Sequence, residues 1–373
     1  MESLIRTNDR IKENQGKPVI GCFPLYPPVE LFAAMGLAPV VLWNLKNSIE
    51  NLEKSDRHIQ QYACGIAREL TQYVMGESGE ILDAFFFYNA CDTLRNLPEI
   101  LISSNTQAGR KTPGFRMHLP QVDREQCNPE PFLKNEITAL IKAIELFAGK
   151  PFSPDAFYQI SKKYAEMRNL CLEAERLVAQ GALTFENFCK VVLSGYTIPV
   201  ENSIINLKNL IMKAEKSQET VYINAVISGI MPPPLPVIRA MEAKDIRVVA
   251  NDIASLRRSY SYSPSPTNNP EDYYADFYSH HFPCTTLLYT ADARIETVMK
   301  LVEDSGAEAV FFCGEKFCEH EYFEFPYLRN QLRDKGIASL FLEFSVDDTC
   351  HVEGHITRVE AFSETLLSGQ RGK

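Results

Sequence analysis

The sequence of 373 residues has no uninterrupted apolar run as long as a membrane-spanning helix, and its first residues lack the apolar core of a secretion signal. We therefore expect a cytoplasmic protein with no membrane association, whose ten cysteines stay reduced and available to a metal. Basic charge is also scarce: 38 Lys and Arg oppose 48 Asp and Glu, for a formal net charge of −10. General nucleic-acid binding needs a basic face, so this class of function is excluded.

Several common motifs are missing as well. The sequence has neither the phosphate-binding loop of P-loop proteins nor the Gly-rich turn of dinucleotide-binding domains, which excludes binding of ATP or NAD by those routes. The G-x-S-x-G nucleophile elbow of many hydrolases is absent. Cys313 and Cys318 do not form a C-x-x-C pair, and no second pair completes a zinc ribbon.

Short apolar segments alternate with helical patterns in the first part of the chain and again in the last part. Strands that are apolar throughout and separated by helices are typical of a parallel sheet covered on both faces. The sequence therefore predicts an α/β protein with one parallel-sheet domain at residues 1–130 and another at residues 216–373. Strands are expected at residues 17–23, 39–43, 81–88, 115–119, 220–227, 247–250, 310–313 and 339–343.

The middle of the chain, residues 131–215, has a different period. Apolar residues such as Ile137, Leu140, Ile141 and Ile144 recur at helical spacing, which predicts a helical insert or linker region. Further helices are expected at residues 29–35, 56–75, 319–335 and 356–368 and from Cys91 onwards. Residues 259–272 are rich in Pro, Ser and Asn and are expected to form a long loop, either functional or a plain surface excursion.

Three cysteines, Cys64, Cys91 and Cys318, stand where an expected strand gives way to a helix. The free N–H groups and the positive dipole end at a helix start lower the pKa of a thiol and favour the thiolate. Three thiolates converging from separate elements suit ligation of an iron–sulfur cluster with one iron left open. The alternative for any single cysteine is that it acts as a small buried apolar residue, which we expect for Cys171 and Cys189.

The sequence around these cysteines helps to choose between a cluster ligand and a small buried apolar residue. Residues 21–31 read GCFPLYPPVEL, Cys64 ends the segment YAC, Cys91 begins CDTLRNL, and Cys318 lies in KFCE. In this order, and across nearly the whole chain, these motifs resemble the subunits of 2-hydroxyacyl-CoA dehydratases, of the 2-hydroxyglutaryl-CoA dehydratase D-component type. They also resemble the related benzoyl-CoA reductase subunits.

The resemblance implies two Rossmann-like domains that hold one [4Fe-4S] cluster on Cys64, Cys91 and Cys318. It implies a dimer, formed with a related second subunit or as a homodimer, that acts on an acyl-CoA substrate. It also implies a separate ATP-dependent iron–sulfur activator that delivers the electrons, and the missing phosphate-binding loop fits because ATP belongs to that activator. Two activities stay open: dehydration of an (R)-2-hydroxyacyl-CoA and ring reduction of benzoyl-CoA.

Two rival roles use the same fold. Cys22, Cys284 and Cys313 are candidate ligands of a second cubane beside the first, which would make a double-cubane [8Fe-9S] cluster as in related homodimeric reductases of small molecules. In the other role, the chain is an electron-relay subunit whose partner holds the substrate. The iron and sulfide content per chain separates one cubane from two.

Three acidic residues, Glu30, Asp92 and Glu319, are candidate residues of the site because each stands beside one of these motifs. A carboxylate in such a place can orient a ligand or border the substrate pocket. The alternative is that each acid caps the start of a helix.

Overall fold

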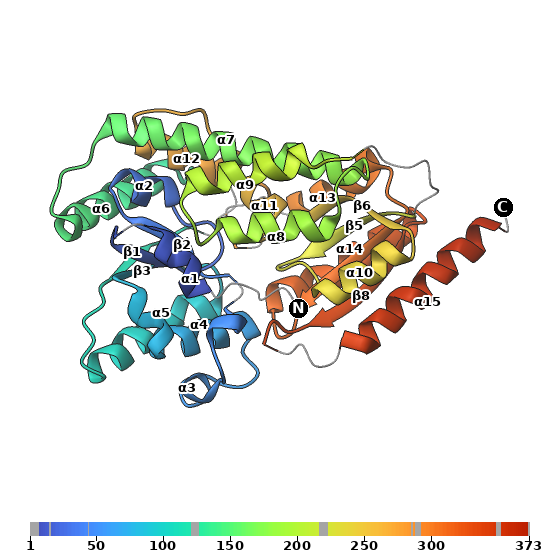
Figure 1. The fold of residues 1–373 in the computed structure, drawn as a ribbon, viewed down its shortest axis with the longest axis horizontal. Helices are drawn as coiled ribbons and strands as arrows, with labels where there is room; N and C mark the ends of the chain where they lie inside the picture. The colour runs from blue at the N-terminus through green and yellow to red at the C-terminus, as the bar shows by residue number, and fades with distance from the viewer. Residues whose placement is uncertain are drawn as a thin grey trace.

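The computed structural model describes residues 7–14, 16–43, 45–120, 127–215, 223–284, 286–287, 292–347 and 352–371. In these residues, two separate four-stranded sheets form, and every strand pair in them is parallel. Figure 1 shows one sheet at the left and the other at the right, each surrounded by helices. The predicted α/β fold with two Rossmann-like parallel-sheet domains is confirmed.

The N-terminal sheet has the strand order β2-β1-β3-β4. Its strands are Val19–Cys22 (β1), Ala38–Val41 (β2), Ala84–Tyr88 (β3) and Gly114–Met117 (β4). Every residue of β1 and β3 is buried, because helices cover both faces of the sheet. This explains why these segments are apolar throughout in the sequence.

The C-terminal sheet repeats the same arrangement in the order β6-β5-β7-β8. Its strands are Ile223–Gly229 (β5), Ile246–Ile253 (β6), Ala309–Glu315 (β7) and Ala338–Phe344 (β8). In each sheet the chain first moves to one side of the first strand and then returns to the other side. Crevices for ligands open at the carboxyl ends of the strands where this reversal occurs, here β1 with β3 and β5 with β7.

The helices follow the strands as the sequence predicted, with two corrections. The expected helix at residues 56–75 is two helices, Glu53–Asp56 (α3) and Gly65–Met75 (α4), separated by turns at residues 57–64. The expected loop at residues 259–272 is shorter, because the helix Arg257–Tyr260 (α11) ends inside it and the helix Pro270–His280 (α12) begins inside it. Pro270, at the first position of α12, lacks the N–H that a helix start leaves unpaired anyway.

The helices of the N-terminal half are Thr7–Ile11 (α1), Val29–Ala34 (α2), Glu53–Asp56 (α3), Gly65–Met75 (α4), Asp92–Gln107 (α5) and Glu130–Ala148 (α6), with short 3-10 turns at Lys12–Asn14, Lys46–Ser48 and Glu77–Ile81. Those that follow are Pro154–Ala179 (α7), Phe185–Gly195 (α8), Val200–Met212 (α9), Leu235–Ala243 (α10), Arg257–Tyr260 (α11), Pro270–His280 (α12), Ala293–Ser305 (α13), Glu319–Asp334 (α14) and Val352–Arg371 (α15). In the described part of the chain, none of the helices has the length and apolar character needed to cross a bilayer.

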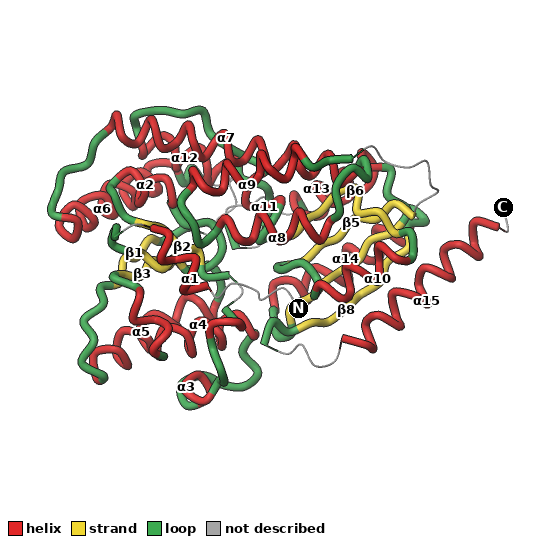
Figure 2. The backbone as a smooth tube through the Cα atoms, in the orientation of Figure 1, coloured by secondary structure: helices red, strands yellow, loops and turns green. Residues whose placement is uncertain are grey.

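The helical middle of the chain is shared between two hydrophobic cores. Apolar residues of α6 belong to the core of the N-terminal sheet, and so do those of α12, which packs against α6. Phe157, near the start of α7, also belongs to that core, whereas Cys171, Ala174 and Val178 of the same helix belong to the core of the C-terminal sheet, together with apolar residues of α8 and α9. The long helix α7 contacts both α2 and β6, and Figure 2 shows it running along both halves of the molecule. Burial on both sides therefore ties the two domains together.

Candidate functional site

The three predicted cysteines all occupy the N-cap position of a helix. Cys64 caps α4, Cys91 caps α5 and Cys318 caps α14. Cys91 and Cys318 are equivalent in the two halves, since each is the third residue after β3 or β7, the strands at the point where the sheet order reverses. Cys64 does not follow a strand directly, because a 3-10 turn and α3 come between β2 and α4.

The fold brings these three cysteines together from two domains. Each is half-buried, and each packs against the core of the N-terminal sheet, although Cys318 belongs to the C-terminal one. They lie near enough for their charges to interact: Cys91 raises the pKa of Cys64, and both Cys64 and Cys91 raise the pKa of Cys318. The site thus exists only in the folded chain with its two domains in contact.

The thiols sit beside the first backbone N–H groups of their helices. The N–H of Leu94 donates to Cys91 Sγ at 3.4 Å, and first-turn N–H groups lower the pKa of Cys64 and Cys318 in the same way. Burial is the larger effect, and it raises the pKa of Cys64 to about 12 and those of Cys91 and Cys318 above their usual value. Burial thus outweighs the helix starts, and the expectation of a lowered thiol pKa is wrong.

The donor set suits a cluster better than a single ion. Within the described residues, no three or more His, Cys, Asp or Glu side chains are grouped closely enough to hold one metal ion. Ligands of a cubane stand further apart than ligands of one ion, because each binds a different iron. Three free thiols at three converging helix starts match that chemistry, and the N–H groups beside them can donate to cluster or ligand sulfur.

Glu30 is buried in a polar network outside the cysteine site. The residue is 1% exposed and forms an ion pair with Arg168 of α7. The hydroxyls of Tyr273 and Tyr274 donate to Glu30 at 3.1 and 2.9 Å. The network joins α2, α7 and α12, so the geometry gives Glu30 a role in holding the two halves together.

Removing the arginine of this network is expected to destabilise the protein strongly. Arg168→Ala leaves the Glu30 carboxylate buried without its cation, which costs about 3–5 kcal/mol in the free energy of unfolding. The measurement is the denaturant midpoint. Lys208→Ala is the matched control. Lys208, on α9, forms an exposed ion pair with Glu166 of α7, the helix that carries Arg168, and loss of such a pair costs about 0–1 kcal/mol. Equal losses in the two variants would contradict the prediction.

Asp92 and Glu319 lie at the first positions of α5 and α14, next to two of the cysteines. Both side chains are exposed, and Asp92 pairs with Arg95 one turn further along the helix at 2.9 Å. Both places favour a negative charge, because they lie at the positive end of a helix dipole.

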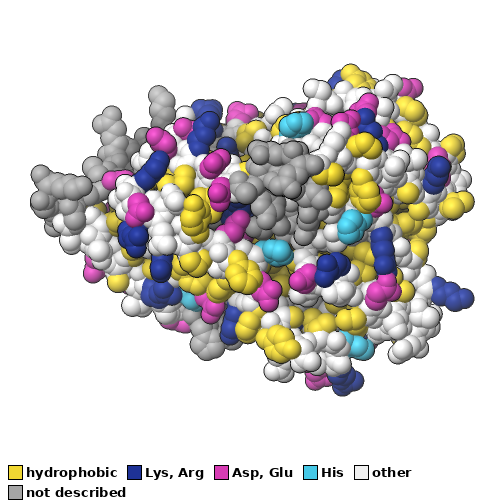
Figure 3. Space-filling model, turned by 180° about the vertical axis from the view of Figure 1, so that it is seen from behind, with side chains coloured by type: hydrophobic (Ala, Val, Ile, Leu, Met, Phe, Trp, Pro, Cys, Tyr) yellow, Lys and Arg dark blue, Asp and Glu magenta, His cyan; other side chains and the backbone are white. Residues whose placement is uncertain are grey.

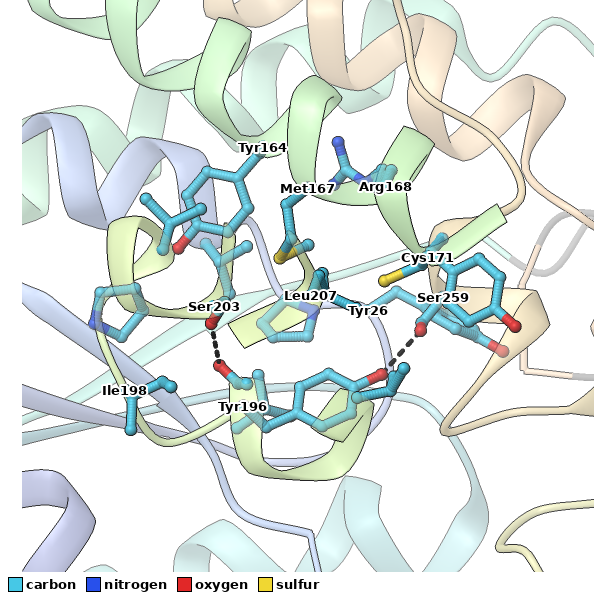
Figure 4. A pocket seen from close by; sticks show the side chains of 18 of the residues that line it. Tyr26, Tyr164, Met167, Arg168, Cys171, Tyr196, Ile198, Ser203, Leu207 and Ser259 are labelled. Carbon is cyan, nitrogen blue, oxygen red and sulfur yellow. Dashed lines mark hydrogen bonds between the residues drawn. The ribbon is translucent and has the colours of Figure 1, made fainter. Parts of the chain in front are cut away.

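A largely apolar pocket lies between the two halves, close to Glu30. Figure 4 shows Tyr164, Met167, Arg168 and Cys171 of α7 along one side, and Tyr196 hydrogen-bonded to Ser259 on the opposite side. None of the three N-cap cysteines lines this pocket. The pocket is therefore distinct from the cysteine site.

The remaining cysteines are dispersed. Cys22 and Cys284 are buried in the core of the N-terminal sheet, whereas Cys313 is buried in that of the C-terminal sheet, so the second cubane stays a prediction. Cys171 and Cys189 are buried in the latter core, as expected. Cys127 is exposed. Cys350 lies outside the described residues.

Sequence reasoning missed two residues next to the cysteines. Phe317 has φ of 64°, a left-handed conformation that is an outlier for a bulky residue, and it directly precedes Cys318. Such strain often marks a functional site. Glu315 is 3% exposed, and burial raises the pKa of its carboxyl group to about 8. A signal was available for Glu315 alone, since a carboxylate at the end of a buried strand is unusual.

Exposed aromatic side chains stand close in sequence to two of the cysteines. Tyr62 precedes Cys64, Phe317 precedes Cys318, and Phe323 lies on the first turns of α14; their exposures are 68%, 46% and 81%. Figure 3 shows the molecule from behind, with apolar side chains interspersed among charged ones on that face.

Comparison with known proteins gives a match over most of the chain. The family model described as 2-hydroxyglutaryl-CoA dehydratase, D-component, matches residues 24–366. The (R)-phenyllactyl-CoA dehydratase beta subunit of Clostridium sporogenes is 23% identical, over 95% of this chain and 93% of that protein. The beta subunit of (R)-2-hydroxyglutaryl-CoA dehydratase from Acidaminococcus fermentans is 24% identical, over 94% of this chain and 93% of that protein. The beta subunit of lactoyl-CoA dehydratase from Anaerotignum propionicum is 23% identical, over 96% of this chain and 94% of that protein.

Proposed function

This chain belongs to the 2-hydroxyglutaryl-CoA dehydratase D-component family, and on that premise we propose that it is the iron–sulfur subunit of an activator-dependent (R)-2-hydroxyacyl-CoA dehydratase. The observation that carries the proposal is the convergence of Cys64, Cys91 and Cys318 at three helix starts. The dehydratase is favoured over a benzoyl-CoA reductase because the three relatives are all dehydratase subunits.

The three cysteines would hold a [4Fe-4S] cluster, which when bound supplies a one-electron donor and an open iron that acts as a Lewis acid. The chain itself supplies the setting. First-turn N–H groups of α4, α5 and α14 point at the sulfurs and offset their negative charge. The thiols are only partly exposed, which limits the access of bulk water to the site.

The partners follow from the relatives. Each of the three is a beta subunit, which supports a related second subunit as the partner of this chain. Their substrates support a CoA thioester with a hydroxyl group on the second carbon. An ATP-hydrolysing iron–sulfur activator would deliver electrons to the dimer.

A second candidate role is electron relay to a cluster in the partner subunit. The apolar pocket of this chain is lined by other residues, among them Tyr164, Met167 and Tyr196, and this separation of pocket and cysteines is compatible with relay. Titration of the reduced, cluster-loaded chain with a 2-hydroxyacyl-CoA separates the roles. A substrate-binding subunit changes its EPR spectrum on titration, and a relay subunit does not.

Anaerobic purification of the chain with any co-purifying subunit tests the proposal. We expect about four iron and four sulfide per chain and an EPR signal from the reduced cluster. About twice that iron content would indicate the double-cubane cluster. A chain that binds no iron after reconstitution would contradict the proposal.

A further inference from the structure

One acidic residue contacts both cysteine loops that meet across the domain boundary. Glu315 is the last residue of β7, and its backbone carbonyl accepts a hydrogen bond from the N–H of Cys318 at 2.9 Å. Between them the chain turns sharply at Phe317, in its left-handed conformation. The main chain of Glu315 thus fixes where Cys318 starts its helix.

The side chain of Glu315 reaches the other domain. Its Oε1 accepts a hydrogen bond from the N–H of Gly65 at 3.0 Å, and Gly65 directly follows Cys64 at the start of α4. The N–H of Val346, after β8, donates to Oε2 at 3.1 Å, and Ser345 Oγ donates to Oε1 at 3.3 Å. One buried carboxyl group therefore bridges the Cys64 loop and the loops after β7 and β8.

A side chain at residue 65 would displace the ends of three polar side chains of the C-terminal domain. A Cβ atom there would stand 2.8 Å from Glu315 Oε1, 2.8 Å from Ser345 Oγ and 3.0 Å from Asp347 Oδ1. Gly65 has no positive φ, so the requirement is for space and not for backbone conformation.

Ion pairs and hydrogen bonds surround this contact. Arg68, on the first turn of α4, forms an ion pair with Asp347, and Lys46 Nζ donates to the backbone carbonyl of Asp347 at 2.7 Å. Both cations belong to the N-terminal half, and Asp347 belongs to the C-terminal half. The start of α4 and the turn at Lys46 are thus both fastened to Asp347 of the C-terminal domain.

We propose that Glu315 is a positioning residue that ties the Cys64 loop to the Cys318 loop and so sets the distance between these two thiols. The inference rests on the proposed function, since the distance matters only for a cluster held by both domains. A buried carboxyl that fixes a ligand loop acts on the metal through that loop, and loss of such a contact typically costs about 10- to 100-fold in metal affinity.

The test measures the rate of iron release to a chelator from the anaerobic, cluster-loaded protein, together with its EPR spectrum. Glu315→Ala is expected to release iron about tenfold faster or more and to change the shape of the EPR signal. Glu315→Gln keeps the size of the side chain and one acceptor oxygen, but its amide nitrogen cannot accept a hydrogen bond from the N–H of Gly65 or Val346. It should release iron faster than the wild type and more slowly than Glu315→Ala. Gly65→Ala keeps the carboxyl, but its Cβ would displace Glu315 Oε1 from the N–H of residue 65, so it should resemble Glu315→Ala. It decides the matter if Glu315→Ala does not fold.

Glu242→Ala is the matched control. Glu242 also accepts a hydrogen bond from the first N–H of a helix, that of Phe185 at 3.0 Å, but it lies on α10 and contacts none of the cysteine loops. Unchanged iron release in Glu315→Ala and Gly65→Ala, or equally fast release in Glu242→Ala, would overturn the positioning role. A wild-type protein that holds no cluster would instead overturn the proposed function.

Discussion

Replacing Cys318 with alanine is expected to remove most of the iron from the anaerobically purified protein. With three protein ligands, the loss of one leaves a cluster bound by two thiolates and exposed at two irons. Cys318 is also the only one of the three proposed ligands that comes from the C-terminal domain, so its loss would remove the link between the proposed cluster and that domain. The same outcome is expected for Cys64→Ala and Cys91→Ala, measured as iron and sulfide per chain and as the EPR signal of the reduced protein.

Cys171→Ala serves as the control for the loss of a cysteine. Cys171 is 3% exposed on α7 and packs in the core of the C-terminal sheet, away from the three helix starts. This variant should keep its iron at the wild-type level. Full retention of iron in Cys318→Ala would show that the assignment of the ligands is wrong.

Turnover is expected to depend completely on an ATP-hydrolysing activator. Elimination of water from a 2-hydroxyacyl thioester by radical chemistry needs electrons of very low potential, and this sequence has no phosphate-binding loop that could couple ATP to their delivery. The assay combines the anaerobic, cluster-loaded protein and its second subunit with 2-hydroxyacyl-CoA esters. With activator and ATP we expect formation of the enoyl-CoA, and without either we expect no product above background.

Two control assays test the dependence of turnover on ATP hydrolysis and on the hydroxyacyl substrate. Replacing ATP with a non-hydrolysable analogue should abolish turnover while leaving the iron and sulfide content per chain unchanged, because the cluster would be present but would not be reduced. Benzoyl-CoA offered in place of the hydroxyacyl ester should not be reduced. Equal rates without ATP, or turnover driven by NADH alone, would refute the mechanism.

The positions of the strands and of the cysteines could be read from the sequence because they depend on local patterns. Each expected strand is found, with ends shifted by a few residues, because a segment buried on both faces must be apolar throughout. Cys91 and Cys318 were placed at helix starts for a similar reason: a buried strand must end before a helix can return across the sheet. The family motifs around the cysteines lie within short stretches of sequence, so they too needed no tertiary structure.

The burial of the cysteines and the contacts of the acidic residues near them were decided by the tertiary structure. A helix start lowers the pKa of a thiol, but burial raises it more, and burial depends on elements far away in the sequence. Glu30 was a candidate for the site, yet its partners Arg168 and Tyr273 come from helices far along the chain and place it in a network between domains. The contact between Glu315 and Gly65 joins residues 250 positions apart, and no local pattern encodes it. Sequence patterns determined which residues could bind a cluster, and only long-range packing determined how their loops are held.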